Sequence, residues 1–102
     1  MRFHLILAIV LAACSSAATA QGRDHNLARN LAATCANCHG TNGRSVGAMP
    51  ALAGQSRGSI AKIMKEFKSG ARSATIMHQI AKGYSDQQID AIAAFLAAQE
   101  AK

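Results

Sequence analysis

The five residues Cys35-Ala-Asn-Cys38-His39 constrain this chain more than any other part of its sequence. Two cysteines two residues apart, followed at once by a histidine, form the attachment sequence for a c-type haem. The two thiols add to the two vinyl groups of one porphyrin, so a short turn must hold the sulfurs at the right separation. The histidine then lies under the macrocycle, where its imidazole can bind the iron from the proximal side. The motif therefore predicts covalent attachment at Cys35 and Cys38, with His39 as an axial ligand.

Other uses of a cysteine pair fit this chain less well. The chain has three cysteines, and one of them, Cys14, lies in the N-terminal leader described below. A zinc site or an iron–sulfur cluster normally needs four ligands, and no second cysteine pair is present to complete one. A thioredoxin-like redox pair is expected among alternating strands and helices, and the sequence shows no β-type alternation. A simple disulfide between Cys35 and Cys38 remains the plain structural alternative to haem attachment.

Residues 1–20 have the pattern of a secretory signal peptide. A short basic start is followed by an unbroken apolar run and then by small residues that end in Ala18-Thr19-Ala20. The apolar run is too short to cross a bilayer comfortably, so no membrane span is expected. A lipoprotein signal that ends at residue 13, with Cys14 as the acylated residue, is the alternative. Both interpretations predict export to the periplasm, and the soluble form is favoured over the lipid-anchored form.

The expected domain, residues 21–102, has the pattern of an all-α protein. Apolar residues recur at helical spacing in residues 23–34, 56–69 and 85–99, and residues 75–82 predict a further helical turn or two. No repeat, linker or second domain interrupts this part of the sequence. The sequence therefore predicts one small all-α domain of four to five short helices around one covalently attached haem.

Two of these helices carry clear end signals. Gly70 is well placed to end the second helix, because glycine readily takes the left-handed conformation found at helix C-termini. Ser85 and Gln88 match a capping box at the start of the last helix, and Tyr84 and Ile89 are placed to form a hydrophobic staple around it.

The expected core is thin for a domain of this size. The chain has no Trp and one Tyr, and only three Phe residues. A small domain with few large apolar side chains needs additional stabilisation, which the apolar faces of a buried porphyrin would supply. We therefore expect the chain without haem to be largely unfolded.

The residues that follow the haem motif predict a loop that wraps round the cofactor. Residues 40–50 are rich in glycine and asparagine, and they end at Pro50. A histidine that binds a metal usually donates its other ring N–H to a carbonyl, which fixes the orientation of the ring. We expect the acceptor for His39 near Pro50; the alternative is that Pro50 only stiffens the loop.

The second axial ligand decides what such a haem can do. The candidate side chains are Met49, Met64, Met77, His25 and His78. Met64 falls on the apolar stripe of its helix and is expected in the core, and His25 precedes the haem motif. Met49 has only a short path round the porphyrin, whereas Met77 and His78 lie far enough along the chain to return to the opposite face. Because adjacent residues point in different directions, only one of the last two can bind the iron, and an open site also remains an alternative.

Several stretches resemble the class I monohaem cytochromes c, within which the chain is similar to the cytochrome c4 and c553 type. The resemblance rests on Cys35–Gly43, Pro50–Gln55, Phe67–Arg72 and the pair Ile76-Met77. The phrase Thr75–Ser85 is similar to the haem subunit of flavocytochrome c sulfide dehydrogenase. Many such subunits and c4 proteins carry two haem domains, and this chain has one haem motif.

The resemblance implies a set of site residues and a partner. It implies thioether links at Cys35 and Cys38, His39 as the proximal ligand and Met77 as the distal ligand. It also implies a small cytochrome c fold and an FAD-containing sulfide dehydrogenase subunit, or another redox protein, as the source of electrons. The expected function is therefore single-electron transfer in the periplasm, with no enzyme activity of the chain itself. The alternatives are a diffusible carrier to a terminal oxidase or reductase, and a haem enzyme or gas-binding protein with an open distal site.

The basic charge of the chain would suit an acidic partner, and the alternative for any single lysine is an ordinary solvated surface. The formal net charge is +6 at pH 7, and basic side chains near an exposed haem edge would speed encounters with such a partner. Nucleic acid is not an expected partner, because the chain is exported and has no basic cluster with aromatic platforms. The basic side chains in question are Arg44, Arg57, Lys62, Lys65, Lys68, Arg72 and Lys82.

Overall fold

The computed structural model describes residues 24–101, and the regular structure in this range is helical, with no strand. This confirms the all-α fold class. The expected signal peptide and Cys14 lie outside the described residues. Within them, no helix has the length and apolar character needed to cross a membrane. The elements after a first helix over residues 24–32 are η1 (Ala33–Cys35), α2 (Ala36–His39), η2 (Thr41–Gly43), α3 (Arg57–Ser69), α4 (Met77–Lys82) and α5 (Asp86–Ala97).

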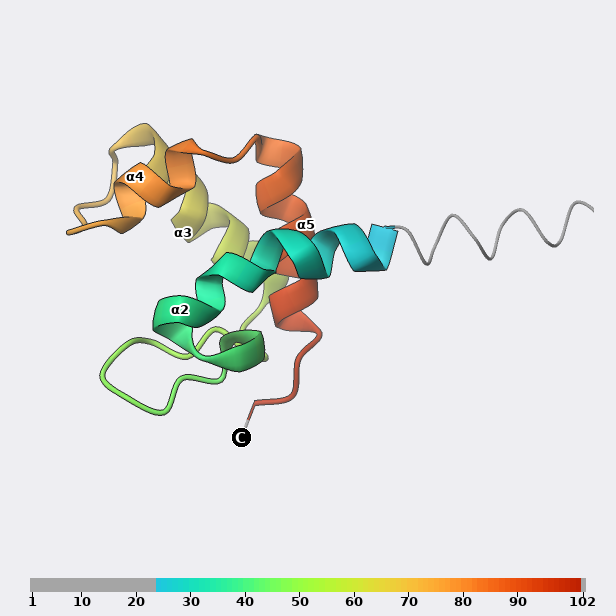
Figure 1. The fold of residues 1–102 in the computed structure, drawn as a ribbon. Coiled ribbons are helices and arrows are strands. Elements are labelled where there is room, and N and C mark those ends of the chain that lie inside the picture. Colours follow the sequence, from blue (N-terminus) through green and yellow to red (C-terminus); the bar gives the residue numbers. More distant parts are fainter. Residues whose placement is uncertain (1–23, 102) are drawn as a thin grey trace, which may run out of the picture.

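The first helix crosses α5 and then runs directly into the haem motif. Figure 1 shows this crossing, with the first helix in cyan to green and α5 in red. The ring of His25 meets Phe95 of α5 edge-on, with ring centroids 6.1 Å apart. Further along, Ala32 is buried in the core, and Leu31 packs against the same cluster. The regular helix changes to the tighter η1 at residue 33, so the short turns of the motif begin on a segment that is already packed.

Helix α3 covers nearly the predicted range, and it ends at the predicted glycine. The Ser56 hydroxyl accepts a hydrogen bond from the Ser59 backbone N–H, which satisfies one of the free donors at the helix start. Gly70 follows the helix in the left-handed conformation, with φ of 85°. Ile60 and Met64 are buried, and α3 packs against both α4 and α5.

Helix α5 supplies most of the core. Its first turn has the predicted capping box, because Ser85 and Gln88 each accept a hydrogen bond from the other's backbone N–H. The largest fully buried side chains all come from this helix: Ile89, Ile92 and Leu96. Tyr84, which precedes the cap, packs against the same core.

Helix α4 is short and is held from two sides. Ala81 is fully buried, and the helix packs along α3. Immediately after it, the Tyr84 hydroxyl lies 2.8 Å from the Thr34 hydroxyl, next to Cys35. This hydrogen bond connects the segment that follows α4 to the haem motif.

Ion pairs hold α3 to its neighbours. Lys65 pairs with Asp90 at 3.0 Å and Lys68 with Asp86 at 3.1 Å, so both connect α3 to α5. Four of the seven basic side chains considered for partner docking therefore have carboxylate partners within the chain, which weakens their attraction for an external partner: Lys62, Lys65, Lys68 and Arg72.

Candidate functional site

The haem motif forms two short helical turns, which place its two thiols one turn apart. Cys35 ends η1 and Cys38 lies within α2, so they are three residues apart in helical backbone and lie on the same side. Both are free thiols; Cys35 is half-buried and Cys38 is exposed. Burial raises the pKa of the Cys35 thiol, and hydrogen bonds from its own backbone and from Thr34 oppose that effect only in part. The arrangement allows both sulfurs to reach one porphyrin.

His39 is fixed by a single hydrogen bond. It ends α2 and is 8% exposed. Its Nδ1 lies 2.6 Å from the Pro50 carbonyl oxygen. A carbonyl oxygen can only accept, so Nδ1 carries the proton and Nε2 keeps its lone pair for a metal. This confirms the expected acceptor near Pro50, which is the carbonyl of Pro50 itself.

The loop that carries Pro50 is tied back at Gly43. The Gly43 carbonyl accepts hydrogen bonds from the backbone N–H groups of Leu52 at 2.8 Å and Ala53 at 3.1 Å. Gly43 has φ of 75°, and a Cβ there would lie 2.9 Å from the Ala53 backbone nitrogen. Glycine is therefore required where the loop closes, and the closed loop returns Pro50 to His39.

Two of the five candidate distal ligands are held elsewhere in the fold. Met64 is buried in the core, as its helical position predicts. His25 is exposed and packs against Phe95.

The remaining candidates lie in two segments that also carry exposed apolar side chains. Met77 begins α4 and is half-buried. Its neighbour His78 is also half-buried, and its buried Nδ1 has no hydrogen-bond partner among the described residues. Met49 is 41% exposed in the loop after the haem motif. Figure 1 places α2 with this loop and α4 on the same side of the molecule, one below the other in the view.

These observations fit a haem c. The thiols of Cys35 and Cys38 suit thioether links, and the imidazole of His39 presents an unprotonated nitrogen. Val46 is fully exposed and Ile76 is 51% exposed, so a porphyrin against these segments would cover apolar surface. The orphaned Nδ1 of His78 is a further sign that this part of the chain contacts a polar group outside it.

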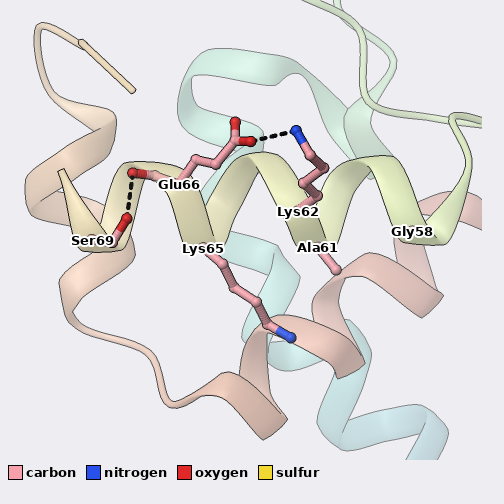
Figure 2. Close-up of a pocket in the computed structure, with 6 residues that line it drawn as sticks. All are labelled: Gly58, Ala61, Lys62, Lys65, Glu66 and Ser69. Atoms are coloured by element: carbon pink, nitrogen blue, oxygen red, sulfur yellow. Dashed lines mark hydrogen bonds and ion pairs between the residues drawn. The ribbon is translucent and has the colours of Figure 1, made fainter. Parts of the chain in front are cut away.

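A large surface hollow lies apart from the haem motif and α4. It has a volume of about 610 Å³ and is open, and its lining comes from α3 alone. Figure 2 shows Lys62 and Glu66 on one side of the helix at this hollow and Lys65 on another. None of its lining residues belongs to the haem motif or to α4, so the hollow is not part of the candidate site.

Two contacts of the fold have no sequence signal. The Tyr84 and Thr34 hydroxyls are 50 residues apart in sequence, and a single sequence offers no pattern that pairs them. Arg72 pairs with Glu66 of α3; their separation of six residues matches no helical spacing, because the chain leaves the helix between them.

Comparisons with known proteins agree with the geometry. A model of the cytochrome c family matches residues 27–100. The cytochrome subunit of sulfide dehydrogenase from Chlorobaculum tepidum is 40% identical over 65 residues, which are 64% of this chain and 59% of that subunit. Cytochrome c-554(548) from Halomonas halodenitrificans is 38% identical over 71 residues, which are 66% of this chain and 86% of that protein.

A solved structure is similar as well. The cytochrome c4 of Acidithiobacillus ferrooxidans is 41% identical with a TM-score of 0.59, over 62% of this chain and 37% of that chain. The chain thus spans less than two thirds of the sulfide dehydrogenase subunit and of this c4 protein. A cytochrome c domain carries covalently attached haem c, which is the cofactor that Cys35 and Cys38 predict. With a family match over most of its length and a haem motif in the expected turn, the chain belongs to the cytochrome c family.

Proposed function

We propose that this protein is an exported single-electron carrier, with haem attached at Cys35 and Cys38 and ligated by His39 and Met77. The observation that carries the proposal is the hydrogen bond between His39 Nδ1 and the Pro50 carbonyl oxygen. It leaves Nε2 as the metal-binding nitrogen and holds the ring in one orientation. When bound, haem c supplies the reversible one-electron oxidation and reduction of its iron.

The chain's own residues would determine the reduction potential of the haem and the access of a partner to it. A methionine thioether at Met77 would favour the reduced state and raise the reduction potential, whereas a second histidine would lower it. His39 is largely buried, so its ring and its hydrogen bond are protected from water. Cys38 is exposed, so this edge of the site is accessible to a partner. With both axial positions filled by side chains, the chain would bind no substrate at the iron.

The proposed partner is the FAD-containing subunit of a sulfide dehydrogenase in the periplasm. The support is the Chlorobaculum tepidum relative, whose name makes it the cytochrome subunit of such an enzyme, and the Thr75–Ser85 phrase that resembles those subunits. In this proposal the flavoprotein oxidises sulfide, and this chain accepts the electrons. Cleavage after Ala20 gives the soluble form that we favour, and acylation of Cys14 is the alternative.

The test of this assignment is anaerobic reduction of the holoprotein. The oxidised protein is mixed with sulfide and an FAD-containing sulfide dehydrogenase subunit, and haem reduction is followed by visible absorption. We expect rapid reduction only when both sulfide and the flavoprotein are present, and co-elution of the two proteins in size-exclusion chromatography. Reduction at the same slow rate with and without the flavoprotein would contradict the assignment.

A second candidate function is a diffusible carrier that serves a terminal oxidase or reductase. The observation in its favour is the Halomonas halodenitrificans cytochrome, 86% of which is covered by the match to this chain. A carrier of this kind elutes as an isolated monomer and exchanges electrons with several partners. Size-exclusion chromatography with the flavoprotein subunit therefore distinguishes the two functions, because only the first predicts co-elution.

A further inference from the structure

Seven residues connect α3 to Met77, the first residue of α4. Arg72 is the most tightly held of the seven. Its backbone N–H donates to the Glu66 carbonyl oxygen at 3.2 Å. Its Nε and Nη2 both contact the Glu66 carboxylate oxygen Oε2, at 2.9 Å and 2.8 Å. The guanidinium carbon also lies 5.8 Å from the centre of the Phe67 ring, within the range of a cation–π contact.

Arg72 is the last fixed point of the chain before α4. Among the described residues, none hydrogen-bonds to residues 73–75. The next backbone contact is at Ile76, whose carbonyl accepts from the N–H groups of Gln79 and Ile80 as α4 begins. On the other side of Met77 the anchor is the buried Ala81. Met77 therefore lies between one anchor at Arg72 and one in the core.

The Glu66 carboxylate pairs with two cationic side chains, each through a different oxygen. Oε1 accepts from Lys62 one helical turn earlier, and Oε2 accepts from Arg72. Figure 2 shows the first of these pairs running along α3. The hydrogen bond from Lys62, and then that from Arg72, lowers the pKa of the Glu66 carboxyl, so the group is ionised at neutral pH. Lys62 connects two residues of one helix, whereas Arg72 connects the helix to the segment that leads to Met77.

We propose that Arg72 is a positioning residue for the axial ligand: through Glu66 it fixes the 70–76 segment and thereby holds the Met77 thioether at the iron. The proposal rests on the proposed function, in which Met77 is the distal ligand. Arg72 touches neither Met77 nor the haem in this role. Its contribution is to reduce the number of conformations in which Met77 moves away from the iron.

The measurable consequence is competition at the distal position. An external ligand such as imidazole binds only when Met77 has left, so its apparent affinity reports the equilibrium between the bound and released methionine. A partly exposed, charge-assisted contact of this kind is worth enough to change that equilibrium about threefold to fivefold. Arg72→Ala should therefore bind imidazole about threefold to fivefold more tightly than the wild type.

The experiment compares Arg72→Ala with Lys62→Ala in the purified oxidised holoprotein. Lys62→Ala is the matched control, because it removes the other cation from the same carboxylate without releasing the 70–76 segment. The readouts are the weak long-wavelength methionine–iron band and the imidazole dissociation constant, both measured well below the melting temperature. We expect Arg72→Ala to have a weaker band and tighter imidazole binding, and Lys62→Ala to stay within about twofold of the wild type.

Two further variants separate positioning from general stability. Arg72→Lys keeps the charge but loses the planar group that makes two contacts, so its imidazole affinity should lie between those of the wild type and Arg72→Ala. Glu66→Gln keeps the size of the side chain and removes its charge, and it should shift the affinity in the same direction as Arg72→Ala. It provides the test if Arg72→Ala does not fold.

The outcomes distinguish this inference from the proposed function. If Arg72→Ala melts at a lower temperature but matches Lys62→Ala in band intensity and imidazole affinity, the pair is only structural and the inference is overturned. If the wild type itself has no methionine–iron band, the assignment of Met77 fails, and the inference falls with it.

Discussion

The double variant Cys35→Ala, Cys38→Ala should lose most of its helical circular dichroism and its cooperative melting transition. Large fully buried side chains in the described core are limited to Ile89, Ile92 and Leu96, and four of the ten buried apolar residues are alanines. Each large side chain contributes about 1.5–3 kcal/mol on burial, against a backbone cost of about 1–2 kcal/mol for every ordered residue. A porphyrin held between the segments that carry Val46 and Ile76 would add the apolar contacts that this core lacks.

Single variants provide the comparison for this result. Cys38→Ala or Cys35→Ala alone retains one thioether link and His39, so each should keep more helix than the double variant. Thermal melts followed at a helical wavelength measure the difference. A double variant that shows the circular dichroism of the holoprotein and melts cooperatively without haem would contradict the account of the core.

Gly43→Ala should lower the stability of the holoprotein by about 2–4 kcal/mol, from the left-handed backbone and from overpacking together. Gly43 has φ of 75°, and an added Cβ would lie 2.9 Å from the Ala53 nitrogen and 3.0 Å from Leu96 Cδ2. Relief of these contacts would move the Gly43 carbonyl, which accepts hydrogen bonds from the backbone N–H groups of Leu52 and Ala53. The loop that returns Pro50 to His39 would then shift, so the axial histidine would be held less firmly.

Gly47→Ala is the matched control, because it lies in the same loop and a Cβ there has no atom within 4 Å. We expect the melting temperature of Gly43→Ala to fall by more than about 10 °C and that of Gly47→Ala to change by no more than a few degrees. Equal melting temperatures for the two variants would show that the loop closure at Gly43 adds little stability.

Helix ends and the orientation of His39 were predictable because their causes are local. Gly70 and the Ser85–Gln88 pair each end or cap a helix through groups within a few residues, and both take the expected positions. The Pro50 carbonyl was predictable for a different reason. A metal-binding histidine needs an acceptor for its second nitrogen, and the loop that follows the motif is the nearest source of one.

The contacts that the sequence did not predict depend on how the chain turns and packs in the assembled fold. The Tyr84–Thr34 hydrogen bond requires that α4 end beside the haem motif. The Glu66–Arg72 pair requires that the chain turn back on α3 after Gly70. Neither spacing repeats with a helical or strand period, and only the assembled fold brings the partners together. The distinction between Met77 and His78 is also not settled by burial, because both side chains are half-buried.

The most direct test of ligation by His39 and Met77 is a visible absorption spectrum of the oxidised and reduced holoprotein, compared with those of Met77→Ala and His78→Ala. A haem ligated by His39 and Met77 predicts the weak long-wavelength methionine–iron band in the oxidised wild type. The band should be lost in Met77→Ala and kept in His78→Ala. A high-spin wild type that binds carbon monoxide when reduced, or a Met77→Ala spectrum unchanged from the wild type, would contradict the His39/Met77 ligation and the electron-carrier function built on it.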